Sequence, residues 1–209
     1  MKTFFVGIAG GTGAGKTTLA TELTNRLGNS AVLIAHDSYY RDLSTLPQGE
    51  RARTNFDAPD ALETELLAAH LDALRKGQSV RVPRYDFSTH SRIGGEEREV
   101  GPSSIVVVEG ILLLSDLGIC ERLDLRVFVE TDADERILRR IQRDVDERGR
   151  SVSSVMEQYL TTVKPMHALH VTPSRALADL VVNGGRDTNK AVDLIVAHAK
   201  ARLSERPPP

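Results

Sequence analysis

Residues 10–17 read Gly-Gly-Thr-Gly-Ala-Gly-Lys-Thr, a spacing that suits the binding of phosphate groups. The run follows an apolar stretch, residues 4–9, and precedes a stretch with helical character, residues 18–27. In that context glycines let successive backbone N–H groups point at phosphate oxygens. A glycine-rich turn with a solvated lysine, the alternative, does not account for these flanks. The run is therefore a P-loop, which predicts the binding of a nucleoside triphosphate.

The P-loop motif predicts the functions of its individual residues. Lys16 brings a mobile positive charge to the terminal phosphates, and Thr17 offers a hydroxyl ligand to Mg²⁺. The residues predicted to contact the nucleotide here are Gly10, Gly11, Thr12, Gly13, Ala14, Gly15, Lys16, Thr17 and Thr18.

Two carboxylates follow apolar runs and suit chemistry beside a P-loop. Asp37 comes just after residues 31–35, where a carboxylate can orient an acceptor hydroxyl and take its proton. Glu109 ends the run that begins at Ile105, where a carboxylate can hold Mg²⁺ as a Walker B acid does. Each has a structural alternative, a helix N-cap for Asp37 and a turn cap for Glu109. Position alone leaves the role of Asp37 open.

Aromatic side chains are concentrated in one part of the chain. There are 4 Tyr and 5 Phe, and more than half of them lie between positions 39 and 87. Such a concentration suits a planar ligand, although an ordinary core position is the better explanation for any single ring. These rings belong to Tyr39, Tyr40, Phe56, Tyr85 and Phe87.

Residues 136–150 are rich in arginine. One face of a predicted helix carries Arg136, Arg139, Arg140 and Arg143, and the other carries Ile137, Leu138, Ile141 and Val145. A solvated face with i,i+4 pairs, such as Arg140 with Asp144, is the usual explanation. The tip Arg148-Gly149-Arg150 follows, and it is suited to close on ATP and neutralise charge on a transferred phosphoryl group.

The elements that must position these residues alternate along the chain. Short apolar runs separated by helical patterns predict the α/β class, with a mainly parallel central sheet flanked by helices. The predicted strands are residues 4–9, 31–35, 105–108, 125–129 and 180–182.

Two further elements are predicted between the second and third of these strands. A helix is expected from about residue 60 to residue 76, between Pro59 and Gly77. Residues 79–100 alternate in short pieces around a polar stretch, which predicts a hairpin inserted at the edge of the sheet and closing over a substrate. The apolar stripe of the helix is expected to comprise Leu62, Leu66, Ala69 and Ala73.

Length and composition limit the classes of function. The chain has 209 residues, which suits one domain, predicted over residues 1–206 with a tail at 207–209. Its net charge of −2 gives no basic field for nucleic acid or for a membrane surface. The single cysteine, Cys120, excludes an intramolecular disulfide, and no apolar run approaches transmembrane length. We expect a soluble, cytoplasmic protein.

Several ordered stretches together resemble the uridine–cytidine kinase family, almost from end to end. The resemblance implies a P-loop kinase fold with a hairpin over the nucleoside and an arginine lid at residues 143–152. It implies transfer of phosphate from ATP, or another donor such as GTP, with Mg²⁺ to the 5′-hydroxyl of uridine and cytidine in pyrimidine salvage. It also implies a homotetramer inhibited by UTP and CTP. The matching stretches are residues 7–18, 37–40, 55–57, 85–92, 108–112, 139–150 and 158–159.

By position, the resemblance assigns site residues. Asp37 is implied as the catalytic base, with Lys16 also catalytic, and Glu109 with Thr17 as the metal site. Arg143 and Arg148 are implied to face the triphosphate. The implied nucleoside contacts are Tyr40, Phe56, Asp57, Tyr85, Phe87, His90, Arg140, Arg150 and Gln158.

The implied base-recognition pair is Tyr85 with His90. Uracil has an acceptor at its 4-position and cytosine a donor, and a hydroxyl or a neutral imidazole can take either role. The chain departs from the family at residues 183–185, Asn-Gly-Gly, where Pro-Arg-Gly is frequent, so any contact from that arginine is absent. Asp187 lies where a residue near the adenine can occur, but the different loop makes that assignment weak.

Two other readings of the sequence remain. Phosphoribulokinase, pantothenate kinase and nicotinamide riboside kinase share the P-loop and the acceptor-side aspartate, but do not explain residues 55–57 together with 85–90. A GTP-dependent switch is the reading from a different class. Residues 189–193 superficially match its Asn-Lys-x-Asp motif, but the aspartate comes one residue late, and no Asp-x-x-Gly stands where the switch belongs.

Overall fold

A parallel five-stranded sheet is the centre of the structure, a computed structural model that describes residues 3–51 and 54–205. The strand order is β2-β7-β1-β8-β9, and every neighbouring pair is parallel. All five predicted strands are confirmed, with bounds within two residues of those expected. They are β1 (Phe4–Gly10), β2 (Ala31–Ala35), β7 (Ile105–Glu109), β8 (Leu125–Glu130) and β9 (Leu180–Asn183).

The register of the sheet decides which residues meet at its carboxyl edge. Ile8 of β1 and Ala35 of β2 both align with Glu109 of β7. The segments that follow these strands therefore begin side by side, and two of them contain Lys16 and Asp37.

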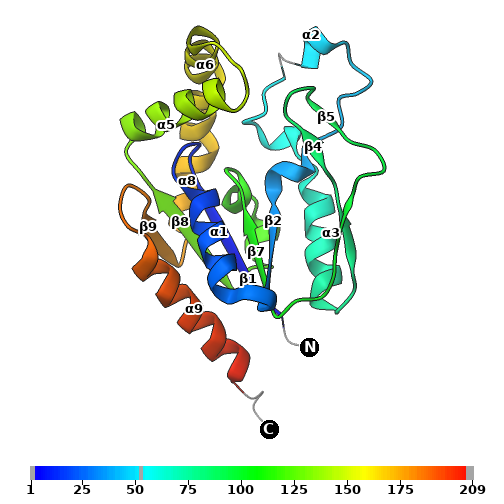
Figure 1. Cartoon of the computed structure of the whole chain (residues 1–209), viewed down its shortest axis with the longest axis vertical. Coiled ribbons are helices and arrows are strands. Elements are labelled where there is room, and N and C mark those ends of the chain that lie inside the picture. Colours follow the sequence, from blue (N-terminus) through cyan, green and yellow to red (C-terminus); the bar gives the residue numbers. More distant parts are fainter. Residues whose placement is uncertain (1–2, 52–53, 206–209) are drawn as a thin grey trace.

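Helices cover both faces of the sheet (Figure 1). Helices α1 (Lys16–Leu27) and α9 (Asn189–Ser204) pack on one face through Leu19, Leu23 and Ile195. Helix α3 (Thr64–Arg75), together with α4 (Leu117–Cys120) and the segment around α8 (Thr172–Ser174), packs on the other. The remaining helices are α2 (Gln48–Arg51), α5 (Ala133–Asp146), α6 (Val152–Gln158) and α7 (Lys164–Met166).

Short helical turns connect these elements. Turns of π-helix, η5 (Tyr159–Val163) and η6 (His167–Val171), lie on either side of α7. Turns of 3₁₀ helix are η1 (Gly28–Ser30), η2 (His36–Tyr39), η3 (Pro59–Ala61), η4 (Leu113–Ser115) and η7 (Arg175–Leu177).

The helix expected over residues 60–76 begins later than predicted. Leu62 is extended and forms an isolated bridge with Tyr40, while the N–H of Glu63 donates to the carbonyl of Tyr39. These contacts keep residues 61–63 out of the helix. The fully buried residues of α3 are Leu67, Leu71 and Leu74. Of the expected stripe, Leu62 is buried and Leu66 and Ala73 pack half-buried against the same core, so the prediction was wrong only for Ala69, which is exposed.

The inserted hairpin is present and has two parts. Strand β3 (Val80–Val82) pairs with β6 (Arg98–Val100), as expected. The polar stretch between them contains a second pair, β4 (Tyr85–Asp86) with β5 (Ser91–Arg92). Neither pair joins the central sheet. In Figure 1, β4 and β5 lie beyond the carboxyl end of β2, across from α5 and α6.

Helix α5 is oriented differently from the expectation. Its buried residues are Arg136, Arg140 and Asp144, whereas Leu138 is 67% exposed. Leu138, on the apolar face of the predicted helix, is therefore in water, and the solvated arginine face is not what the structure contains, since Arg136 and Arg140 are buried. The charged face packs inward because it has polar partners there, which are described below.

Three smaller expectations concern the rest of the chain. Cys120 is a buried free thiol. Within residues 3–51 and 54–205, no helix combines the length and apolar character needed to cross a membrane. The predicted tail at residues 207–209 lies outside the described residues.

The contrast between Leu71 and Leu138 gives a stability prediction. Leu71 is 1% exposed, so Leu71→Ala is expected to lower the free energy of unfolding by about 2–5 kcal/mol through lost burial and the cavity that remains. Leu138→Ala should change it by less than about 0.5 kcal/mol, because the side chain is already in water. Urea titrations followed by circular dichroism measure both, and equal losses would contradict the orientation of α5.

Candidate functional site

The P-loop joins the end of β1 to the start of α1. Gly13 and Gly15 have φ angles of 73° and 95°, which other residues rarely adopt, so the glycines set the path of the turn. The nine nucleotide contacts predicted for residues 10–18 lie in the last residue of β1, in the turn and in the first residues of α1. Lys16 is buried, and its Nζ donates to the carbonyl of Gly11 at 3.1 Å. A bound phosphate oxygen can replace that internal acceptor.

Thr17 and Glu109 meet at the predicted metal position. The Thr17 hydroxyl donates to Oε1 of Glu109 at 3.2 Å, and Glu109 is the last residue of β7. Burial raises the pKa of the Glu109 carboxyl, and the positive charge of Lys16 counteracts this. A hydroxyl and a carboxylate are hard oxygen ligands, so this donor set fits Mg²⁺ bound together with nucleotide phosphates.

Asp37 lies in η2, directly after β2. Its Oδ1 is buried and has no hydrogen-bond partner within the described ranges, and no side chain caps η2. The N-cap alternative is therefore not what the structure contains. Burial raises the pKa of Asp37, against the opposing effect of Lys16, Arg148 and Arg143. A buried carboxylate with a free oxygen is suited to accept a proton from a ligand hydroxyl.

Aromatic rings form one end of a cavity of about 390 Å³ that begins at the P-loop. The ring of Tyr40 contacts those of Phe56, Tyr85 and Phe87, with centroids 5.3–6.4 Å apart. His90 stacks on Phe56 at 4.8 Å with 17° between the ring planes. All five line the cavity. Tyr39 does not, because it is fully buried in the core and bonds His70, so the aromatic prediction was wrong for Tyr39.

Polar groups with unmet hydrogen-bonding capacity lie among these rings. The Tyr85 hydroxyl is buried and, within the described part of the chain, has no hydrogen-bond partner. Burial raises the pKa of Asp57, and the charge of Arg140 lowers it. Burial, with Arg150 and Arg148, lowers the pKa of His90, so His90 is neutral at pH 7. This end of the cavity therefore offers neutral hydrogen-bonding groups and one carboxylate to a ligand.

Arginines from α5 and the following loop form another wall of the cavity. Arg140 donates to the Thr12 hydroxyl at 3.2 Å and to Oε1 of Gln158 at 2.8 Å. Arg150 donates to the same Gln158 oxygen at 2.6 Å. Arg143 and Arg148 line the cavity as well. Every nucleoside-contact residue that the sequence predicted thus lies around this one cavity.

Four residues near the cavity were not assigned a role from the sequence. Ile111, Ser88 and Ser154 line it. Asp144 is fully buried beside the arginines, although its spacing indicated only a surface pair with Arg140. Ile111 and Ser88 were visible as parts of the matching stretches 108–112 and 85–92, whereas Ser154 gave no signal.

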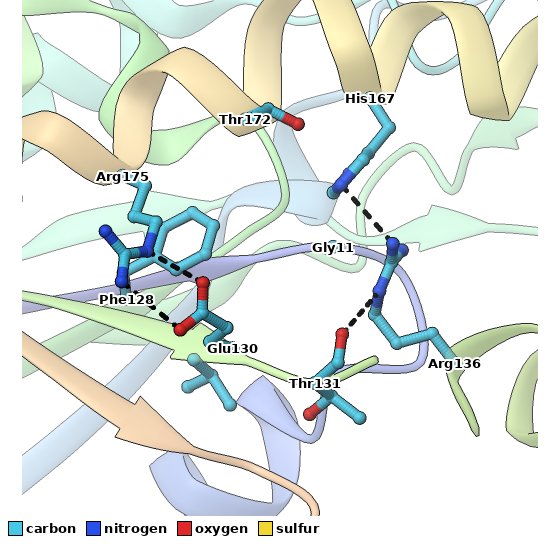
Figure 2. A pocket seen from close by; sticks show the side chains of 9 residues that line it. Gly11, Phe128, Glu130, Thr131, Arg136, His167, Thr172 and Arg175 are labelled. Carbon is cyan, nitrogen blue, oxygen red and sulfur yellow. Dashed lines mark hydrogen bonds and ion pairs between the residues drawn. The ribbon is translucent and has the colours of Figure 1, made fainter. Parts of the chain in front are cut away.

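A second cavity of about 120 Å³ lies behind the P-loop (Figure 2). Arg136 lines one side of it, donating to the carbonyl of Thr131 at 3.0 Å and lying 3.4 Å from Nε2 of His167. Burial and Arg136 lower the pKa of His167 to about 4, so His167 can accept this hydrogen bond. A Cβ at Gly11 would overlap Arg136 and His167. Arg136 and His167, which line this cavity, therefore pack closely against the P-loop at Gly11.

Asp187, Gly184 and the residues that resemble a guanine-reading motif all make hydrogen bonds within the fold. Oδ1 of Asp187 accepts the N–H of Asn189 at 2.9 Å, next to the start of α9. Asn189 and Asp193 both accept hydrogen bonds from Arg26 of α1. Gly184 bonds Arg139 through its carbonyl. The residues that superficially match a guanine-reading motif are thus engaged in packing α9 against α1.

Comparison with known proteins agrees with a P-loop kinase. Residues 5–191 match the phosphoribulokinase / uridine kinase family. A uridine kinase from Halobacterium salinarum is 52% identical over 202 residues, covering 97% of this chain and 89% of that protein. One from Chloroflexus aurantiacus is 48% identical over 203 residues, covering 97% of each. The structure of phosphoribulokinase from Rhodobacter spheroides has a TM-score of 0.62 at 16% identity, covering 88% of this chain and 73% of that one, which shows the fold alone.

The sequence match covers the P-loop, Asp37, the hairpin and the arginine-bearing segment, so it includes every part of the cavity. The GTP-switch reading is thereby overturned. The protein is a kinase that uses a nucleoside triphosphate, and the chain belongs to the phosphoribulokinase / uridine kinase family.

Proposed function

We propose that this kinase transfers the γ-phosphoryl group of ATP to the 5′-hydroxyl of uridine or cytidine, giving UMP or CMP for pyrimidine salvage. The observation that carries the proposal is one cavity that includes Lys16 of the P-loop, the free carboxylate of Asp37, and the pair Tyr85 and His90. Relatives named uridine kinase, at 48–52% identity over nearly the whole chain, support a nucleoside as the acceptor.

Asp37 is the proposed base. Its carboxylate takes the proton of the 5′-hydroxyl as the bond from that oxygen to the γ-phosphorus forms. The bond between the γ-phosphorus and the bridging oxygen breaks, and ADP leaves. Asp57, in the same cavity, is proposed to accept hydrogen bonds from the ribose hydroxyls, which holds the 5′-hydroxyl in line with the phosphorus.

The donor side stabilises negative charge. The backbone N–H groups of the P-loop, Lys16, and the guanidinium groups of Arg143 and Arg148 are the proposed partners of the β- and γ-phosphates. Mg²⁺, when bound, neutralises charge on these phosphates, and Thr17 and Glu109 are the residues that would hold it. GTP remains an alternative donor, because the P-loop recognises phosphates and not the purine.

Tyr85 and His90 are the proposed readers of the base. The free hydroxyl of Tyr85 and the neutral ring of His90 can each donate or accept a hydrogen bond. That freedom supports the use of both uridine and cytidine.

The remaining family expectations are part of the same proposal. We assign one kinase domain to residues 1–206, with residues 79–100 as the nucleoside hairpin and 143–152 as the lid. UTP and CTP are proposed feedback inhibitors, since each carries a pyrimidine for one half of the cavity and phosphates for the other. A cytoplasmic homotetramer is the proposed form of the enzyme.

ADP formation from Mg·ATP tests the proposal, with uridine, cytidine, adenosine, ribulose 5-phosphate and pantothenate offered separately. Turnover is expected with the two pyrimidine nucleosides. Turnover with ribulose 5-phosphate or pantothenate instead would move the chain to another branch of its family. Turnover with cytidine alone would retain the mechanism and refute the dual role of His90.

Replacement of Asp37, the proposed proton acceptor, gives a sharper prediction. Asp37→Asn keeps the size of the side chain but removes the proton acceptor, so kcat should fall by about 10² to 10⁴. ATP binding should be nearly unchanged, because the P-loop is intact. Steady-state kinetics and calorimetry measure the two effects, with Asp60→Asn, at an exposed position, as the matched control.

The pH profile identifies Asp37 independently of the size of that loss. Only the deprotonated carboxylate accepts a proton, so kcat should fall as pH falls through its pKa. Because burial raises this pKa, the acid limb should lie above the ordinary aspartate value of about 3.9. The limb should disappear in Asp37→Asn. An unchanged rate or an unchanged limb in this variant would remove the assignment.

His90→Leu tests base recognition. Loss of a half-buried hydrogen-bonding partner in the cavity should raise the KM for nucleoside by about tenfold and alter the ratio of uridine to cytidine use. Thr89→Ala is the control, since Thr89 bonds Asp86 and Ser91 within the hairpin and does not line the cavity. Equal turnover of both nucleosides in His90→Leu at wild-type KM would argue against base reading by His90.

A further inference from the structure

Asp144 lies at the centre of the arginine cluster. Its side chain is 0% exposed, and four guanidinium groups lie within 4 Å of it, those of Arg140, Arg143, Arg148 and Arg150. Within the described residues, no other carboxylate has this number of arginine partners. A carboxylate removed from water is stabilised only where such partners surround it.

The two oxygens of Asp144 hold different arginines. Oδ1 accepts hydrogen bonds from Arg143 at 2.7 and 2.9 Å and lies 3.4 Å from Nη1 of Arg148. Oδ2 lies 3.4 Å from Nη1 of Arg150 and 3.6 Å from Nε of Arg140. One oxygen therefore holds the pair assigned to the triphosphate, and the other holds the pair assigned to the nucleoside.

The main chain of Asp144 also fixes the loop that carries two of these arginines. Its carbonyl accepts the N–H of Arg150 at 3.0 Å, and the N–H of Glu147 bonds the carbonyl of Arg143 at 2.9 Å. Gly149 turns the chain with a φ angle of 63°. Asp144 thus holds the tip of the loop through its backbone and its side chain at once.

From this centre the arginines reach both halves of the cavity. On the donor side, Arg140 bonds Thr12 of the P-loop. On the acceptor side, Arg140 and Arg150 share Oε1 of Gln158, and the guanidinium of Arg148 lies 5.0 Å from the ring centroid of Phe87 in the hairpin. A shift of the Asp144 carboxylate would displace groups in both halves together.

The negative charge of Asp144 holds the positively charged arginines together. Four guanidinium groups around one carboxylate leave an excess of positive charge, so the guanidinium groups repel one another. A bound polyphosphate would neutralise this excess. Burial lowers the pKa of Arg140 and of Arg148, the charge of Arg143 lowers both further, and Asp144 opposes this change in each. Without the carboxylate the guanidinium groups would separate toward water.

We propose that Asp144 is a positioning residue that couples the donor and acceptor halves of the site, because the arginines held by its carboxylate reach into both halves. The inference rests on the proposed function, since it concerns the binding of a nucleotide together with a nucleoside. Because coupling between two ligands is reciprocal, Asp144 makes each substrate tighten the binding of the other.

The test compares Asp144→Asn with the wild type by calorimetry. The affinity for uridine is measured with and without the non-hydrolysable analogue Mg·AMP-PNP, and the affinity for the analogue with and without uridine. Asp146→Asn is the matched control, since Asp146 lies on the same helix and is exposed. Asp144→Glu keeps the buried charge and moves both oxygens by one methylene, which tests position where the Asn variant does not fold.

In the wild type and in Asp146→Asn, each ligand should tighten the other. In Asp144→Asn and Asp144→Glu this mutual effect should disappear, KM should rise for both substrates, and kcat/KM should fall by about 10²-fold, as expected when reacting groups are displaced by about 1 Å. A purely structural role predicts a different pattern, in which the folded fraction and kcat fall together while both KM values and the mutual effect stay unchanged.

One result would overturn the role of Asp144, and a different result would overturn the proposed function. Retention of the mutual effect and of both KM values in folded Asp144 variants would overturn the role of Asp144 while leaving the function intact. Failure of the wild type to bind uridine, with AMP-PNP still bound, would overturn the proposed acceptor, whatever the Asp144 variants do.

Discussion

Burial of opposite charges at the carboxyl edge of the sheet is the constraint on which the cavity depends. Lys16, Asp37 and Glu109 come from three segments, and the strand order β2-β7-β1 brings them together. Burial lowers the pKa of Lys16 and raises the pKa of each acid, because the charged forms lose water. Each charge is then stabilised by its neighbours. The P-loop, η2 and the end of β7 therefore act as one electrostatic unit, which the phosphates of a nucleotide complete.

The same constraint explains why α5 turns its charged face inward. Arg136 and Arg140 are only 7% and 6% exposed, and both lie against the P-loop. The approach is possible because of glycine: a Cβ at Gly13 would overlap the carbonyl of Arg136, and one at Gly11 would overlap its side chain. The P-loop glycines thus serve two purposes. They open a path for phosphate on one side and allow an arginine-bearing helix to pack on the other.

The sequence predicted the parts of the fold that depend on local pattern. The apolar runs predicted five strands, and the spacing of residues 10–17 predicted a phosphate-binding turn at its actual place. It failed where a long-range contact overrides a local pattern. Leu62 bridges Tyr40 instead of starting a helix, and Leu138 is exposed because the opposite face of α5 has polar partners in the interior, such as Thr12 and Gln158. Asp144 was missed for a different reason: its arginine partners are close in sequence, and i,i+4 spacing to Arg140 cannot distinguish a solvated pair from the centre of a buried cluster.

The top of the cavity is built from segments outside the central sheet. The hairpin is tied to the core by side chains, such as Arg92 to the carbonyl groups of Tyr39 and Tyr40, and it meets the arginine loop where Arg148 lies over Phe87. Such attachments change position at lower cost than strand register does. A kinase must admit two substrates and then exclude water, which would otherwise compete as the acceptor. Arg148, which lies over Phe87, also belongs to the arginine cluster around Asp144, so the hairpin and the proposed donor site are attached through the same guanidinium group.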